Sequence, residues 1–314
     1  MKLDVLNIFL ILLSGIFAFV LPFQTFLFVY AFLGPLHYLT EINWLQQRNY
    51  FLHDKTNVYY FFIPILIIGC LVYIPTFHSL KPTIPFLIFF TFLVSIFNSK
   101  ENNKLHTNWK FLVFLTLGIT TSYYFRKSFQ TIFSLFLPTL IHVFIFTGIF
   151  IFSGFQKTRN KLALQTFVVF MLTSVGLMTF NLNSHFYMED IASKYNSFEK
   201  LNATVFAIFD KEVLASQDIY YSNFGIKIMQ FIAFAYTYHY LNWFSKTSVI
   251  QWHKTTKIKI ITILLIWMVS VLLYLYNYKI GLYWLYLLSL THVILEFPLN
   301  ITSVKNLLKG KSYP

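Results

Sequence analysis

The stretch that decides the fold is residues 131–155, TIFSLFLPTLIHVFIFTGIFIFSGF, which contains no Asp, Glu, Lys or Arg. A transmembrane helix needs roughly 20 predominantly apolar residues, so this stretch is long enough to cross a bilayer. Similar runs recur along the 314-residue chain, in which 57% of residues are hydrophobic and only 11% are charged. Soluble domains carry about 25% charged residues. The sequence therefore predicts an all-α, polytopic transmembrane helix bundle.

The apolar runs predict about ten transmembrane helices. The first run lacks a small-residue cleavage site, so we expect it to be the first span and not a signal peptide. No soluble segment is long enough to fold separately, and we predict a single transmembrane domain over residues 1–314. The predicted spans cover residues 5–21, 24–45, 58–78, 83–98, 109–125, 131–155, 162–182, 228–245, 257–276 and 281–303.

The distribution of Lys and Arg predicts that both termini are cytoplasmic. With the N-terminus inside, the inner stretches hold 16 Lys and Arg residues and the outer stretches hold 8. Positive residues favour the inner side of a membrane. The net charge of +13 thus reflects loops between spans, and we expect no nucleic-acid partner. We expect an integral protein of the bacterial inner (cell) membrane, with the lipid bilayer and a lipophilic small molecule as its partners.

The one long loop, at about residues 183–227, lies outside in this topology. Its middle, residues 191–214, mixes apolar and charged side chains and could form an amphipathic helix on the membrane surface. The loop is acidic, and its acidic residues are Glu189, Asp190, Glu199, Asp210, Glu212 and Asp218.

Four histidines lie inside apolar segments, where polar groups are costly and usually face the bundle interior. They are His37, His142, His239 and His292. Their four segments run in the same direction in the predicted topology, and each histidine lies about 11–13 residues from the outer end. At 1.5 Å per residue, they share roughly one depth. The single cysteine, Cys70, excludes an intramolecular disulfide and a thiolate cluster. We therefore predict a metal site made of these four imidazoles.

Three further polar residues lie close to these histidines in the sequence. Glu41 and Glu296 each follow a candidate histidine by four residues, and Asn242 follows another by three. Residues four apart share one face of a helix. A metal-bound histidine usually donates its second ring N–H to a carboxylate or carbonyl, which fixes its orientation. Each glutamate could serve its own histidine or one on a neighbouring helix.

The pattern resembles the Brp/Blh family of membrane β-carotene dioxygenases. In that family, intramembrane histidines hold a non-haem iron. The resemblance implies that the four histidines bind Fe(II), that Glu41 and Glu296 tune it, and that a polyene enters sideways from the bilayer. The chain departs from the family after its first histidine, where Tyr38 and Glu41 stand in place of a small residue and an Asp. It also lacks a close His pair on a late helix. The residues that carry the resemblance are His37 after Gly34 and Pro35, His142, the run from His239 to Asn242 and Trp243, and His292.

Three other functions fit the same residues. Pairs of intramembrane histidines could hold haem b in an electron carrier. His and Glu could form the relay of a proton-coupled transporter. The polar groups could also merely join helices in a structural or assembly protein. Two histidines in predicted loops, His53 and His185, could line an entrance to the site. The remaining histidines all lie in predicted loops or at segment ends, where we otherwise expect them to be solvated: His53, His78, His106, His185 and His253.

Overall fold

The computed structural model describes residues 2–48, 58–97, 108–180, 191–209, 216–246, 251 and 254–309. Throughout this part of the chain, all regular secondary structure is helical. The all-α prediction is confirmed. The number of about ten spans, the cytoplasmic termini and the single domain remain predictions.

The chain forms two compact units. Unit 1 comprises residues 1–37 and 143–285, and unit 2 comprises residues 38–142 and 286–314. Three helices run from one unit into the other: α2 (Pro22–Arg48), η4 (Thr131–Phe146) and α15 (Tyr278–Leu308). The other helices of unit 1 are α1 (Lys2–Val20), α7 (Thr147–Thr158), α8 (Lys161–Thr179), α9 (Ile191–Tyr195), η5 (Asn196–Phe198), α10 (Glu199–Ile208), α11 (Ser216–Tyr221), α12 (Asn223–Ser245) and α14 (Lys257–Tyr276). Those of unit 2 are α3 (Tyr59–Tyr73), η2 (Pro75–Thr83), α4 (Ile84–Phe97), α5 (Trp109–Tyr124) and α6 (Arg126–Gln130).

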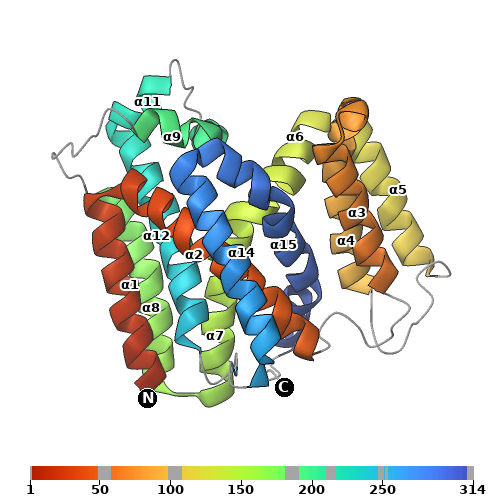
Figure 1. Ribbon diagram of the computed structural model, residues 1–314. Coiled ribbons are helices and arrows are strands. Elements are labelled where there is room, and N and C mark those ends of the chain that lie inside the picture. Colours follow the sequence, from red (N-terminus) through yellow and green to blue (C-terminus); the bar gives the residue numbers. More distant parts are fainter. Residues whose placement is uncertain are drawn as a thin grey trace. The chain divides into compact units, whose positions relative to one another are not determined.

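Helix α12 is the core of unit 1. It packs against α1 and α8, and the three helices run side by side in Figure 1. Phe234 is fully buried at the middle of α12. Polar groups join α12 to α1: the Gln230 side chain donates to the carbonyl of Phe19 at 2.9 Å, and the Tyr238 hydroxyl donates to Asn7 at 3.4 Å. Such bonds satisfy groups that lipid cannot solvate, and they hold α12 in a defined position.

Within unit 2, α4 packs against both α3 and α5. Helix α5 comes close to a side chain of α4 at Gly118, where an added Cβ would lie 2.1 Å from the ring of Phe89. The Phe89 ring also contacts the rings of Phe129 and Phe133, whose centroids lie 5.6 and 5.0 Å away. A residue without a side chain is therefore needed at position 118.

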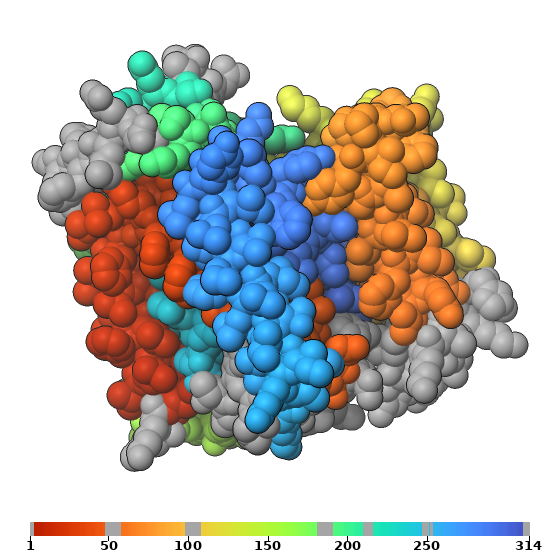
Figure 2. Space-filling model, in the orientation of Figure 1, coloured from red at the N-terminus to blue at the C-terminus, as the bar shows by residue number. Residues whose placement is uncertain are grey.

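The outer surfaces of several helices are apolar. On α14, which lies on the near face of unit 1 in Figure 2, large hydrophobic side chains such as Leu265, Leu272 and Leu275 are exposed. Large exposed apolar surfaces on a soluble monomer are uncommon, whereas lipid covers them in a membrane protein. Within the described part of the chain, six helical stretches are long and apolar enough to cross a membrane: Leu3–Val20, Pro75–Phe97, Arg126–Thr158, Lys161–Thr179, Lys257–Tyr276 and Tyr278–Leu308. These features are consistent with an integral membrane protein.

The described part of the predicted long loop is largely helical. Helices α9, η5 and α10 fall within the predicted amphipathic segment and bury Ile191, Tyr195, Leu201 and Val205. The segment is divided into three short helices, and residues 210–214 of it lie outside the described residues. Its place on a membrane surface remains a prediction. Helix α12 begins at Asn223, five residues before the predicted span at 228–245, and the Ser222 hydroxyl caps it by accepting from the backbone N–H of Gly225.

Candidate metal centre

Two candidate histidines form a buried pair within unit 1. His37 on α2 and His239 on α12 bring their Nε2 atoms to 3.1 Å, with the rings nearly perpendicular at 81°. His37 is 1% exposed and His239 is 9% exposed. The rings of Tyr240 and Trp243 lie 5.1 and 5.6 Å from the ring of His37. Aromatic side chains therefore limit the positions that the His37 ring can take.

The second nitrogen of His239 has a partner that the sequence did not predict. The Thr147 hydroxyl lies 2.9 Å from Nδ1 of His239, and Thr147 is buried. Thr147 is the first residue of α7, which follows η4 directly. The sequence had suggested Asn242 for this role, because it lies three residues after His239 on the same helix. Asn242 is also buried, but the hydroxyl against Nδ1 comes from another helix.

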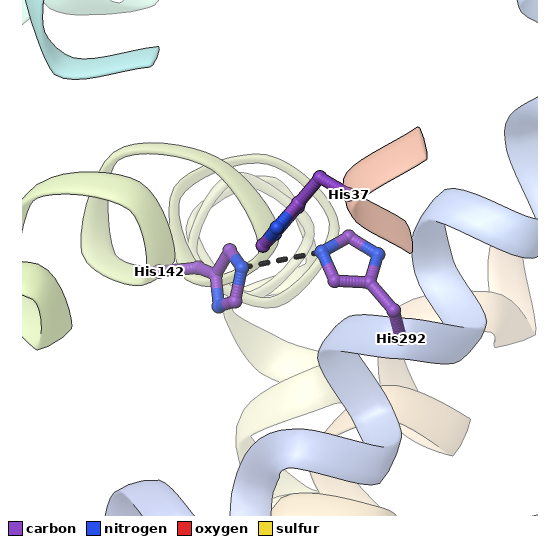
Figure 3. A group of neighbouring side chains, drawn as sticks. All are labelled: His37, His142 and His292. Atoms are coloured by element: carbon purple, nitrogen blue, oxygen red, sulfur yellow. Dashed lines mark hydrogen bonds between the residues drawn. The ribbon is translucent and has the colours of Figure 1, made fainter. Parts of the chain in front are cut away.

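The other two candidate histidines form a similar pair within unit 2. His142 in η4 and His292 on α15 bring their Nε2 atoms to 3.3 Å, as the dashed line in Figure 3 shows. Their rings are inclined at 73°, and each residue is 2% exposed. The ring of Tyr38 stacks on that of His292, with centroids 4.3 Å apart and planes at 21°. Tyr38 thus covers one face of this imidazole.

The carboxylate of Glu296 contacts the pair formed by His142 and His292. Oε2 of Glu296 is 3.0 Å from Nδ1 of His142, and it also accepts from the side-chain amide of Asn300 at 3.4 Å. Glu296 is therefore placed against a histidine of a neighbouring helix, one of the two arrangements that the sequence allowed. Glu41 is buried as well, and its role remains a prediction.

His142 lies in an unusual helix. Residues 131–146 form a π-helix that contains Pro138. Proline lacks a backbone N–H and its ring clashes with the preceding turn, so the usual α-helical bonding cannot continue through it. π-Helical turns are rare and are frequently found at functional sites. The wider helix carries His142 to His292 and is followed by the helix that begins with Thr147.

The distances between paired nitrogens suit two ligands of one metal ion. For metal–nitrogen bonds of about 2.0–2.1 Å, two ligands are separated by about 2.9 Å at right angles and about 3.3 Å at the tetrahedral angle. The observed separations are 3.1 and 3.3 Å. Imidazole suits Zn, Cu, Fe and Ni, so the donors do not select among these metals. An N–H···N hydrogen bond between neutral rings would span a similar distance.

Two ligands on opposite sides of a haem iron would be about 4 Å apart, twice a metal–nitrogen bond. In this structure each pair is closer than that, and haem ligation remains one of the hypotheses. Among the other histidines, His78 is exposed in η2, and its Nε2 lies 3.0 Å from the carbonyl of Val72. The rest lie outside the described residues: His53, His106, His185 and His253.

Comparison of the chain with protein-family models, with curated proteins and with solved structures gave no match. The site must therefore be interpreted from its own residues, and the resemblance to the β-carotene dioxygenases remains a hypothesis.

Proposed function

We propose that this chain is a membrane-embedded metalloprotein that oxidises a lipid-soluble substrate, with one metal ion held by His37, His142, His239 and His292. The observation that carries the proposal is the pair of buried imidazole contacts with Nε2 atoms 3.1 and 3.3 Å apart. Of the four, His37, His142 and His292 form a group that could hold one metal ion, and Figure 3 draws them.

Continuity along two helical segments supports a shared site. His37 is followed directly by Tyr38 in α2, and the Tyr38 ring stacks on His292. His142 precedes Thr147 by five residues along η4 and α7, and the Thr147 hydroxyl contacts His239. Along the sequence, each pair thus has a member within five residues of a side chain that contacts the other pair.

The outer contacts favour imidazoles that are ready to bind a metal. An ionised carboxylate at Glu296 would only accept hydrogen bonds, and a proton on Nδ1 of His142 would leave a lone pair on Nε2. A carboxylate placed behind a metal-bound histidine also raises the basicity of the ligand. Thr147 can accept from Nδ1 of His239 in the same way. Both arrangements direct Nε2 toward the paired ring.

We propose non-haem Fe(II) as the metal, on the strength of the sequence resemblance. Such an iron would supply reactions with O₂. The chain's own part is to hold the imidazoles in a dry environment and to orient the substrate. The buried site and the apolar helix surfaces favour a substrate that dissolves in the bilayer, and the resemblance points to a carotenoid.

The proposal is tested by metal analysis of the detergent-purified protein and of single His→Ala variants. We expect roughly one metal ion per chain in the wild type and loss of the metal when His142 or His292 is replaced. His78→Ala is the matched control, because His78 is an exposed histidine outside both pairs. A wild type that takes up no Fe, Zn, Co or Cu would refute the metal site. It would favour the transporter hypothesis, in which buried His and Glu relay protons.

A further inference from the structure

One face of α12 carries three aromatic side chains that begin beside His37. Tyr236, Tyr240 and Trp243 are spaced by four and three residues, so they share a face of the helix. The rings of Tyr240 and Trp243 lie 5.1 and 5.6 Å from the ring of His37, and the ring of Tyr236 lies 6.1 Å from that of Tyr240. All four residues belong to unit 1. The three aromatic residues therefore form a stripe that starts at a candidate metal ligand.

Further rings continue this stripe toward the helices of the predicted outer loop. The ring of Tyr236 lies 5.1 Å from that of Phe26 on α2, which in turn lies 5.6 Å from the ring of Tyr195 on α9. The ring of Tyr195 lies 6.2 Å from that of Tyr220 on α11. Figure 1 shows α9 and α11 at the end of unit 1 that is opposite the N-terminus. The rings thus connect His37 to that end, and every one of them belongs to unit 1.

The last tyrosine in this series has a partner that can take a proton. The Tyr220 hydroxyl lies 2.7 Å from Oε1 of Glu199 and 3.5 Å from the carbonyl of Ala192, so the carboxylate is its closer acceptor. The Tyr195 hydroxyl donates instead to the side-chain oxygen of Asn202 at 2.6 Å. Proton transfer needs a base within hydrogen-bond reach, and a carboxylate is such a base whereas an amide is not. Burial also raises the pKa of Tyr195 well above its ordinary value, so this hydroxyl keeps its proton.

This difference matters for one-electron oxidation. Tyrosine and tryptophan lose an electron far more readily than phenylalanine does. An oxidised tyrosine becomes a long-lived neutral radical only where its phenolic proton can leave, because the oxidised phenol is a strong acid. The chain contains 39 Phe and 21 Tyr, so ring contacts alone would decide little. The informative feature is that the series has a candidate metal ligand at one end and a tyrosine–carboxylate pair at the other.

We infer that these rings form an electron-transfer relay, in which Tyr220 is the terminal electron donor to the metal centre. This role rests on the proposed oxidative metal site. One electron from Tyr240 reduces a centre that O₂ has left strongly oxidising in the absence of substrate, and electrons from the outer rings refill the vacancy in turn. Tyr220 gives up one electron inward and its phenolic proton to Glu199, which leaves a neutral tyrosyl radical. A soluble one-electron reductant of the ascorbate class then returns the electron, and Glu199 returns the proton. The relay thus protects the site from its own oxidant.

The test starts the relay with light, so that it does not require a bound metal. In a Cys70→Ala background, Lys246→Cys carries a ruthenium polypyridyl photosensitiser at the end of α12, three residues after Trp243. A cobalt(III) ammine complex takes one electron from the excited label and leaves it strongly oxidising. We expect a neutral tyrosyl radical, trapped by freezing and detected by electron paramagnetic resonance, and its loss in Tyr220→Phe. Tyr221→Phe is the matched control, because Tyr221 is the next residue of α11 and is 50% exposed, and it should keep the signal.

A second pair of variants tests the path along α12. Tyr236→Phe keeps the ring but removes the readily oxidised phenol, so transient absorption should show slower formation of the Tyr220 radical. Tyr238→Phe makes the same change on the same helix, at a ring that contacts Phe170 and Phe234 outside the relay. It should leave the rate unchanged.

Three results would overturn the relay: no tyrosyl radical in the labelled parent protein, an unchanged signal in Tyr220→Phe, or equal effects of the test variants and their controls. Any of them would leave the metal site standing, because the experiment involves no metal ion. A wild type that takes up no metal would instead overturn the proposed function, and the light-driven signal would still decide whether the rings conduct.

Discussion

Replacing Glu296 by Gln tests how strongly the second pair depends on a buried charge. Oε2 of Glu296 lies 3.0 Å from Nδ1 of His142 and accepts from Asn300 at 3.4 Å. The side chains of His142 and Glu296 are only 2% and 4% exposed, so salt screens their interaction weakly. Glutamine keeps the size and one acceptor oxygen but removes the negative charge. It also presents an NH₂ group, and its single oxygen must serve either His142 or Asn300.

The expected cost follows from the role of such partners. Removing a group that orients a metal-bound histidine typically weakens metal affinity by about 10- to 100-fold, or roughly 1.4–2.8 kcal/mol. We expect Glu296→Gln to fall in this range. Glu296→Ala should cost more, because Asn300 loses its buried acceptor and His142 loses the carboxylate oxygen 3.0 Å from its Nδ1.

The measurement is a competition titration of detergent-purified protein against a coloured chelator. Glu199→Gln is the matched control, since Glu199 is a hydrogen-bonded carboxylate on α10 outside both histidine pairs. We expect it to leave metal affinity unchanged. If Glu296→Gln bound metal as tightly as the wild type while His142→Ala did not, the carboxylate would have no orienting role. An equal loss in Glu199→Gln would show that the assay reports general instability.

Three other predictions concern topology, activity and packing. In a Cys70→Ala background, Lys200→Cys should be labelled from outside intact cells, because Lys200 is exposed on α10 and lies in the predicted outer loop; labelling only after cell disruption would reverse the topology. In cells that make β-carotene, the wild-type chain should bleach the colour, and His142→Ala should abolish bleaching while His78→Ala should not. If the His142→Ala protein still bleached the colour, this residue would be excluded from the reaction. Gly118→Ala should lower stability by about 1–3 kcal/mol, since the new Cβ would overlap the ring of Phe89. Gly154→Ala, which meets nothing within 4 Å, is the control, and equal unfolding temperatures in detergent would contradict the packing argument.

The sequence alone determined the class of fold and the residues worth examining. Uncharged runs such as residues 131–155 must be helical in a membrane, because a lipid-exposed backbone has to satisfy its own hydrogen bonds. The same runs make any histidine inside them conspicuous. All four candidate histidines are buried in the structure. Helix ends were harder to predict, as the start of α12 at Asn223 shows, because a single capping serine can extend a helix into a predicted loop.

Only the tertiary structure decided which groups meet. The spacing of Glu296 and His292 allowed a contact within one helix, but Glu296 lies against His142. Asn242 was the nearest polar neighbour of His239 along the chain, yet the contact comes from Thr147. Spacing within a helix defines which residues share a face, and it contains no information on how that helix is rotated against its neighbours. The rotation is set by the packing of many apolar side chains from distant segments, and it determines the partner of each buried imidazole.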